Sequence, residues 1–138
     1  MNTRTYGYRY SDTADVTTIA AAMRRDIKAA IKDGLLPTGK YRVRTHRYAG
    51  GQSINIAAVI PAALRDCDGQ VYATWFDGQL EECSWCRDEL GAHRVLTEDA
   101  AVAKMTLDRI HGAYNHDGSD TAVDYFDVRY YGDVVVGE

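Results

Sequence analysis

The residues best suited to chemistry are cysteines and a histidine in the middle of the chain. Cys83 and Cys86 form a Cys-x2-Cys pair in "CSWCRDELGAH", with Cys67 upstream and His93 downstream. Zinc prefers four tetrahedral sulfur and nitrogen ligands, and a Cys-x2-Cys turn supplies two of them. The four residues therefore form a candidate zinc site of three cysteines and one histidine. A redox pair at Cys83 and Cys86, or ordinary reduced cysteines, are the alternatives that this spacing leaves open.

A second candidate site is the basic and aromatic segment "YRVRTHRYAGGQS" at residues 41–53. Its arginines can contact phosphates while a tyrosine stacks on a base, or they can pair with acidic groups of the protein itself. The glycine pair is not a P-loop, because no Gly-Lys-Ser/Thr follows it. The residues that we assign to partner or nucleic-acid binding are Tyr41, Arg42, Arg44, His46, Arg47, Tyr48, Gly50 and Gly51.

An acidic segment, "DGSDTAVDYFD", gathers Asp117, Asp120, Asp124 and Asp127. Their spacing is not that of a calcium-binding EF-hand loop. In a strand, Asp124 and Asp127 would point to opposite faces. We therefore expect turn and capping roles, or contact with the protein's own arginines in the 41–48 segment.

Nothing in the sequence indicates a catalytic site. The four histidines are scattered along the chain. No nucleophile lies in the sequence context of a known triad or nucleophile elbow. The sequence therefore predicts a binding protein that is not an enzyme.

Length and composition predict a single domain over residues 1–138, long enough to bury a core. No apolar run approaches the roughly 20 residues of a membrane span, and the N-terminus lacks the apolar stretch of a secretory signal. With an odd count of three cysteines, the chain cannot form a closed disulfide framework. These features predict a cytoplasmic protein without membrane association.

Charge is distributed unevenly along the chain. Residues 1–50 carry ten Lys/Arg and four Asp/Glu (+6), and residues 51–138 carry six and sixteen (−10), which together give the net charge of −4. Such a division indicates a polyanion-binding face, or two halves that neutralise each other in the folded chain.

Apolar residues spaced three and four apart predict a helix over residues 11–34. Ser11 or Asp12 is the expected N-cap, Asp15 favours the positive end of the helix dipole, and Gly34 ends the helix. The predicted buried stripe is Val16, Ile19, Ala20, Met23, Ile27, Ala30 and Ile31. A solvated basic face is expected at Arg24, Arg25, Lys28 and Lys32.

Alternating residues in "KYRVRTHRY" and "SINIAAVI" predict a β-hairpin with a glycine loop. Gly50 or Gly51 is expected to supply a positive φ in that loop. The basic residues Arg42, Arg44 and His46 are expected on the outward face. The inward residues are expected to be Tyr41, Val43 and Thr45 on the first strand and Ile54, Ile56 and Ala58 on the second.

The rest of the chain is predicted by weaker signals. We expect a short helix in "PAALRDC", turns at two Asp-Gly pairs around a strand at 71–76, and a helix from Thr97 to about Tyr114. The stripe of that last helix is expected at Ala103, Leu107, Ile110 and Tyr114. A closing hairpin is expected from "AVDYFDVRYY" and "VVVG". This order predicts an α+β fold, with two helices packed on a mainly antiparallel sheet built from two β-hairpins.

Two segments, "YRVRTHRYAGGQSINIA" and "AYNHDGSDTAVDYFDVRYYGDV", together resemble large polyvalent protein-associated domain 29, a small α+β domain of phages, plasmids and other mobile elements. The first segment matches through Tyr48, Ala49, Gly50, Gly51, Ser53 and Ile54. The second matches through Asp117, Ser119, Asp120, Asp124, Tyr125, Phe126 and Asp127. With the helices that precede them, the resemblance covers most of the chain, and neither segment is a known catalytic signature.

The resemblance implies a non-enzymatic accessory protein of a phage or mobile element. Such a protein would bind a host macromolecule, foremost a host protein, in the host cytoplasm, for host takeover or counter-defence. Two alternatives come from the residues themselves: a nucleic-acid-binding domain that uses the 41–48 strand, and a zinc-stapled domain. The oligomeric state is left open.

Overall fold

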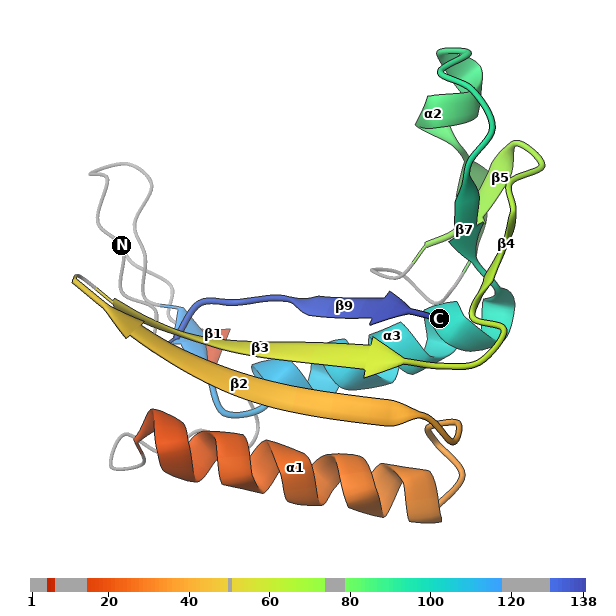
Figure 1. Cartoon of the computed structure of the whole chain (residues 1–138). Helices are drawn as coiled ribbons and strands as arrows, with labels where there is room; N and C mark the ends of the chain where they lie inside the picture. Colours follow the sequence, from red (N-terminus) through yellow and green to blue (C-terminus); the bar gives the residue numbers. More distant parts are fainter. Residues whose placement is uncertain (1–4, 7–14, 50, 74–78, 118–129) are drawn as a thin grey trace.

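The computed structural model of the chain describes residues 5–6, 15–49, 51–73, 79–117 and 130–138. It confirms the predicted α+β class. A two-layer body carries a projecting arm, residues 64–73 and 79–96, at the end of the sheet where β3 finishes (Figure 1). The body contains α1 (Val16–Lys32), β2 (Lys40–Tyr48), β3 (Gly51–Val59), α3 (Glu98–Gly112) and β9 (Val134–Gly137). Two short strands, β1 (Thr5–Tyr6) and β8 (His116–Asp117), pair with each other.

Helix α1 forms where the apolar spacing predicted it, but its cap is different. Asp15 is the N-cap, since its carboxylate accepts the Thr18 amide at 2.8 Å. This bond also lowers the pKa of Asp15. The expected caps Ser11 and Asp12 lie outside the described residues. Gly34 follows the C-cap with φ of +76°, as predicted for the end of the helix.

Strands β2 and β3 form the predicted antiparallel hairpin, in register from Lys40 opposite Val59 to Tyr48 opposite Gly51. The inward residues are as expected, except that Thr45 is exposed near the end of β2. The core comprises Val43, Ile54, Ile56 and Ala58 from this hairpin, the stripe of α1, and Ala103, Leu107, Ile110 and Tyr114 from the α3 segment. Both helices thus pack on one face of the sheet (Figure 1).

Of the two glycines expected to supply a positive φ in the hairpin loop, Gly51 does not, and the prediction for Gly50 stays a prediction. The φ of Gly51 is not among the positive values, and Gly50 lies outside the described residues. Space constrains Gly51 instead, because a Cβ there would lie 3.1 Å from Cε2 of the Tyr48 ring. The glycine therefore makes room for an aromatic side chain.

The third strand joins the sheet in a way that the sequence did not predict. Strand β9 pairs parallel with β3, from Ile56 opposite Val134 to Val59 opposite Gly137. The residues expected to form the other strand of a closing hairpin, 122–129, lie outside the described part. Parallel pairing follows from the connection, because α3 carries the chain back between β3 and β9.

The arm contains β4 (Leu64–Asp66), β5 (Gln70–Tyr72), β6 (Leu80–Glu82), α2 (Ser84–Arg87) and β7 (Arg94–Leu96). Strand β4 pairs with β7, and β5 pairs with β6. The prediction of a short helix in "PAALRDC" is wrong. Ala62 has a φ of +57° and the Ala63 amide bonds to the Ile60 carbonyl, so a turn ends there and the next residues extend into β4. Asp68-Gly69 forms one expected turn, and the other, at 77–78, lies outside the described residues.

Among the described residues, no helix has the length and apolar character needed to cross a membrane.

Among the described glycines, Gly132 has the closest contact with another backbone segment, and this contact gives a test of the fold. Its φ is +127°, and a Cβ there would lie 2.0 Å from the Ile54 carbonyl oxygen. We expect Gly132→Ala to destabilise the protein by on the order of 3 kcal/mol in chemical denaturation. Gly137→Ala is the control, since a Cβ at Gly137 meets nothing within 4 Å. Equal stability of the two variants would contradict this strand arrangement.

Candidate functional site

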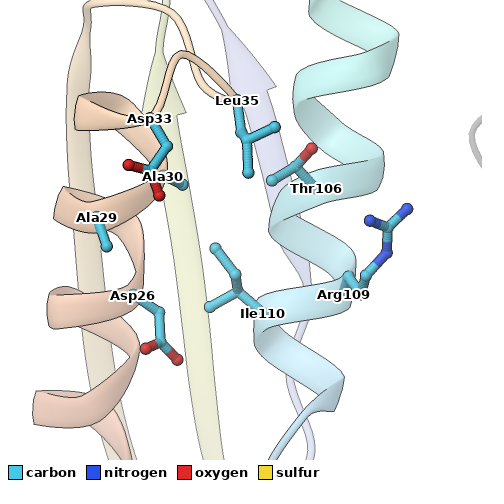
Figure 2. Close-up of a pocket in the computed structure, with 8 residues that line it drawn as sticks. All are labelled: Asp26, Ala29, Ala30, Asp33, Leu35, Thr106, Arg109 and Ile110. Atoms are coloured by element: carbon cyan, nitrogen blue, oxygen red, sulfur yellow. The ribbon is translucent and has the colours of Figure 1, made fainter.

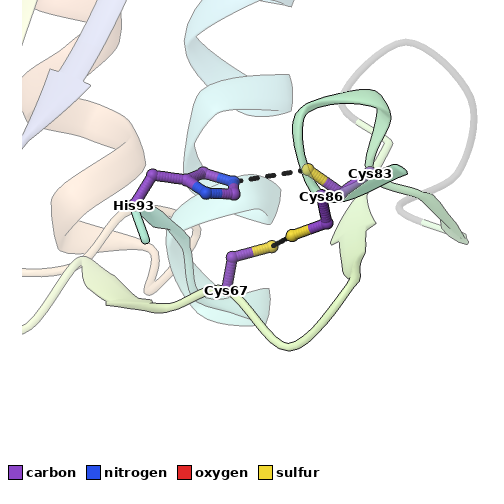
Figure 3. Close-up of side chains that lie close together, drawn as sticks. All are labelled: Cys67, Cys83, Cys86 and His93. Carbon is purple, nitrogen blue, oxygen red and sulfur yellow. Dashed lines mark hydrogen bonds between the residues drawn. The ribbon is translucent and has the colours of Figure 1, made fainter. Parts of the chain in front are cut away.

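The three cysteines and His93 come together in the arm. Cys67 follows β4, Cys83 follows β6, Cys86 lies in α2 and His93 precedes β7 (Figure 3). Their side-chain ligand atoms all lie within 4.8 Å of one another. The predicted set therefore forms one cluster, although its members are spread over 27 positions of the sequence, from 67 to 93.

Backbone hydrogen bonds hold the loops that carry these residues. The Cys67 amide donates to the His93 carbonyl at 3.0 Å, and the Cys83 amide donates to the Gly69 carbonyl at 2.9 Å. Gly69 and Gly91 have φ of +104° and +107°, a left-handed conformation that glycine adopts without steric cost. The two glycines thus turn the chain beside the ligands, a role that the sequence analysis missed for Gly91.

The distances inside the cluster approach those of a tetrahedral metal site. The Cys83 sulfur lies 3.3 Å from Nε2 of His93, and the Cys67 and Cys86 sulfurs lie 3.5 Å apart. Zinc–sulfur bonds of about 2.3 Å and zinc–nitrogen bonds of about 2.0 Å place tetrahedral ligand atoms roughly 3.5–3.8 Å apart. Small side-chain movements therefore suffice to surround one ion.

His93 is oriented for ligation by its other nitrogen. Nδ1 lies 3.2 Å from the Gly91 carbonyl oxygen, which can only accept a hydrogen bond. The proton of a neutral ring therefore belongs on Nδ1, and Nε2 keeps a lone pair directed toward Cys83. The Trp85 indole donates to the same carbonyl at 3.0 Å, and its ring centroid lies 5.6 Å from that of His93.

The thiols affect one another's ionisation. The pKa of Cys83 is lowered to about 7, first by the amide of Cys86 and also by a hydrogen bond to His93. The pKa of Cys86 is raised to about 11, first by its hydrogen bond with Cys67 and then by burial. The Cys83 thiolate is therefore favoured in this cluster, whereas the Cys86 thiolate needs a compensating cation.

The described part of the arm has almost no apolar core of its own. Among its described residues only Ala73 and Cys83 are buried, and neither belongs to the core cluster of the body. Three of its large apolar side chains, Leu80, Trp85 and Leu90, are 51%, 45% and 55% exposed. A segment of this length with so little burial needs a further constraint to hold one structure.

The basic segment divides between the two faces of the sheet. Arg42, Arg44, His46 and Tyr48 are exposed on the face that α1 and α3 leave open, because their partners in β3 alternate with the buried ones. Tyr41 and Arg47 are odd-numbered positions of the same strand and therefore lie on the opposite face, the one on which the helices pack. The Tyr41 hydroxyl donates to the Pro37 carbonyl at 2.6 Å, and the charge of Arg47 helps to lower the pKa of Asp15.

The acidic segment contributes little to the described structure. Asp117 lies in β8. Asp120, Asp124 and Asp127 lie outside the described residues, so their predicted roles stay predictions.

A groove between α1 and α3 is a second place where a ligand could bind (Figure 2). Asp26 and Asp33 line it from α1, and Arg109 and Thr106 line it from α3. Asp26 accepts the hydroxyl of Tyr114, so this carboxylate contributes to packing. The lining contains no cysteine, histidine or lysine and does not form a nucleophile–base pair.

Comparisons of the chain with protein-family models, curated proteins and solved structures found no match.

The sulfur positions predict which disulfide forms in metal-free protein. A mild two-electron oxidant such as diamide should add first to the Cys83 thiolate, and thiol–disulfide exchange should then leave the bond between Cys67 and Cys86, because their sulfurs are already 3.5 Å apart. The two thiols lose two protons and two electrons, and diamide is reduced to its hydrazine. Mass spectrometry after chymotryptic cleavage at Tyr72, Leu80 and Trp85 separates the three cysteines. Cys83→Ser should keep this cross-link, and a dominant Cys83–Cys86 product would contradict the geometry.

Proposed function

We propose that the chain is a zinc-binding protein in which Cys67, Cys83, Cys86 and His93 hold one Zn²⁺. The observation that carries this proposal is the convergence of four ligand atoms within 4.8 Å. Three thiolates and an imidazole are a donor set that zinc prefers. Zinc would also stabilise the thiolate form of Cys86, which the neighbouring thiols disfavour in the metal-free cluster.

The role that we propose for the ion is structural. Four protein ligands fill a tetrahedral site, whereas a catalytic zinc keeps one position for water or substrate. The scarcity of buried apolar residues in the arm supports the same role, because zinc would supply the constraint that a core supplies elsewhere.

Leu80, Trp85 and Leu90 are exposed on the arm, and exposed large apolar side chains are typical of protein-binding surfaces. Their exposure therefore supports the proposal that the protein is a binding module. Three statements about the whole protein stay predictions: the resemblance to a mobile-element domain, the host partner and the lack of enzymatic activity.

Metal analysis of protein purified without chelators tests the proposal. We expect about one zinc per chain by inductively coupled plasma mass spectrometry. Cys67→Ser, Cys83→Ser, Cys86→Ser and His93→Ala should each lose most of it, because three ligands bind zinc far more weakly. His46→Ala is the matched control, since His46 lies on β2 and belongs to the body. Less than about 0.2 zinc per chain in wild type would reject a tightly held site.

A ligand exchange separates loss of metal from loss of fold. His93→Cys should retain zinc, since structural zinc modules use four cysteines as well as three cysteines and one histidine. If His93→Ala folds by circular dichroism and still holds about one zinc per chain, His93 is not a ligand.

Removal of zinc should loosen the arm and leave the body intact. We expect amides such as those of Cys67, Cys83 and Arg87 to exchange hydrogen at least about tenfold faster after chelation, because their bonds lie within the arm. Amides in α1 and β3 should change little, since the body's core contains none of the four ligands. Uniform acceleration across the whole chain would contradict a local role.

A further inference from the structure

Strand β2 presents a row of positive charge on the open face of the sheet. Lys40, Arg42 and Arg44 are exposed and share one parity, and His46 and Tyr48 continue the row. Residues two apart on a strand lie about 6.7 Å from each other on the same face. The row is therefore a line of evenly spaced donors along an edge strand.

The positive surface continues around that edge onto α1. The Arg24 guanidinium donates to the Val43 carbonyl at 2.8 Å, which places it beside the outer edge of β2. Lys28 lies one turn further along α1 and lines the same hollow as Arg24, Tyr41 and Val43. We call Arg24, Lys28, Lys40, Arg42 and Arg44 the basic surface.

Acidic residues of the same segment point elsewhere. Residues 15–48 contain eight Lys/Arg and three Asp/Glu, a net charge of +5. Asp26 and Asp33 lie on the side of α1 that faces α3, as Figure 2 shows, and Asp15 caps the helix. The fold thus separates the two signs of charge within one segment.

Such clustering of like charge opposes folding. Arg24 and Lys28 stand four residues apart on a helix, an arrangement that is mildly destabilising for like charges. Within the described part of the chain, no residue of the basic surface takes part in an ion pair. Among the described residues, the basic surface therefore does not neutralise acidic groups of the protein itself. A polyanionic ligand would relieve the repulsion between its positive charges.

The rest of the open face combines small residues with two exposed valines. Ser53, Asn55 and Ala57 of β3 lie opposite His46, Arg44 and Arg42. Val59, opposite Lys40, and Val135, beside Ala57, add exposed apolar surface that bases can cover. Tyr48 is 44% exposed, and its ring stacks on that of His46 with centroids 5.8 Å apart. Proteins that bind single strands combine cationic side chains, which contact the phosphates, with exposed aromatic rings, on which the bases stack. This face of the sheet offers both.

We propose that the basic surface and the adjoining floor of β3 bind a single strand of nucleic acid. Lys40, Arg42 and Arg44 contact successive phosphates, and His46 and Tyr48 stack with bases. Arg24 and Lys28 extend the positive field around the β2 edge. This proposal does not depend on zinc, because none of its residues lies in the arm.

Fluorescence anisotropy with labelled 15-nucleotide single strands of RNA and DNA, and with the matching duplex, tests the proposal. We expect wild-type protein to bind single strands more tightly than duplex, with affinity that falls as salt rises. Three phosphate contacts correspond to a slope of about −2 in log K against log salt for single strands. Arg42→Ala with Arg44→Ala should weaken binding at least about tenfold and reduce the magnitude of this slope by more than half.

The matched control replaces the same number of charges on another surface. Lys104→Ala with Arg109→Ala, on α3, brings the net charge from −4 to −6, as the β2 double variant does. The control should bind as wild type does, and Tyr48→Ala should weaken binding without changing the slope. Absent binding, equal losses in the two double variants, or a preference for duplex would each overturn the proposal.

Zinc content and nucleic-acid binding are separable in these experiments. The β2 double variant should keep its zinc, and chelated wild-type protein should keep most of its single-strand affinity. Loss of affinity on chelation alone would place the binding surface on the arm instead of β2, and would overturn the assignment.

Discussion

Burial of two helices against a single face of the sheet is the constraint from which the rest of the molecule follows. The stripe of α1 and that of α3 meet Val43, Ile54, Ile56 and Val134 in one core. Once these residues are buried, strand alternation forces their neighbours to the opposite face. The open face is therefore a consequence of the packing, and its composition is free to serve a ligand.

The same constraint leaves most of the arm without support. It departs from the sheet after β3 and returns at α3, and among its described residues only Leu96, at the end next to α3, packs against the body's core. The hydrophobic effect is weak in such a segment because little apolar area is removed from water. Backbone bonds between the Cys67 and His93 segments bring four ligands together, and a metal bond is strong enough to replace the missing burial.

Sequence patterns predicted the parts of the fold in which local periodicity and burial agree. The α1 stripe and the β2–β3 alternation are clear because each element buries one face. "PAALRDC" failed because Ala62 adopts a positive φ, which its residue type does not signal. The parallel pairing of β9 depends on a contact between distant segments, and the short strand "VVVG" carries no sign of direction.

For the cluster, Cys-x2-Cys was a local signal, whereas the proximity of Cys67 and His93 required the arm to fold back on itself. The signal for Arg24 and Lys28 was present as a basic helix face, but only the Arg24 bond to Val43 places it beside β2.

The central claim is that one ion joins the loops of the arm through three sulfurs and one nitrogen. X-ray absorption at the zinc edge of the purified protein tests it most directly. The account predicts a four-coordinate first shell, with three sulfur neighbours near about 2.3 Å and one imidazole nitrogen near about 2.0 Å. A first shell made only of oxygen and nitrogen, or one with fewer than three sulfurs, would contradict it.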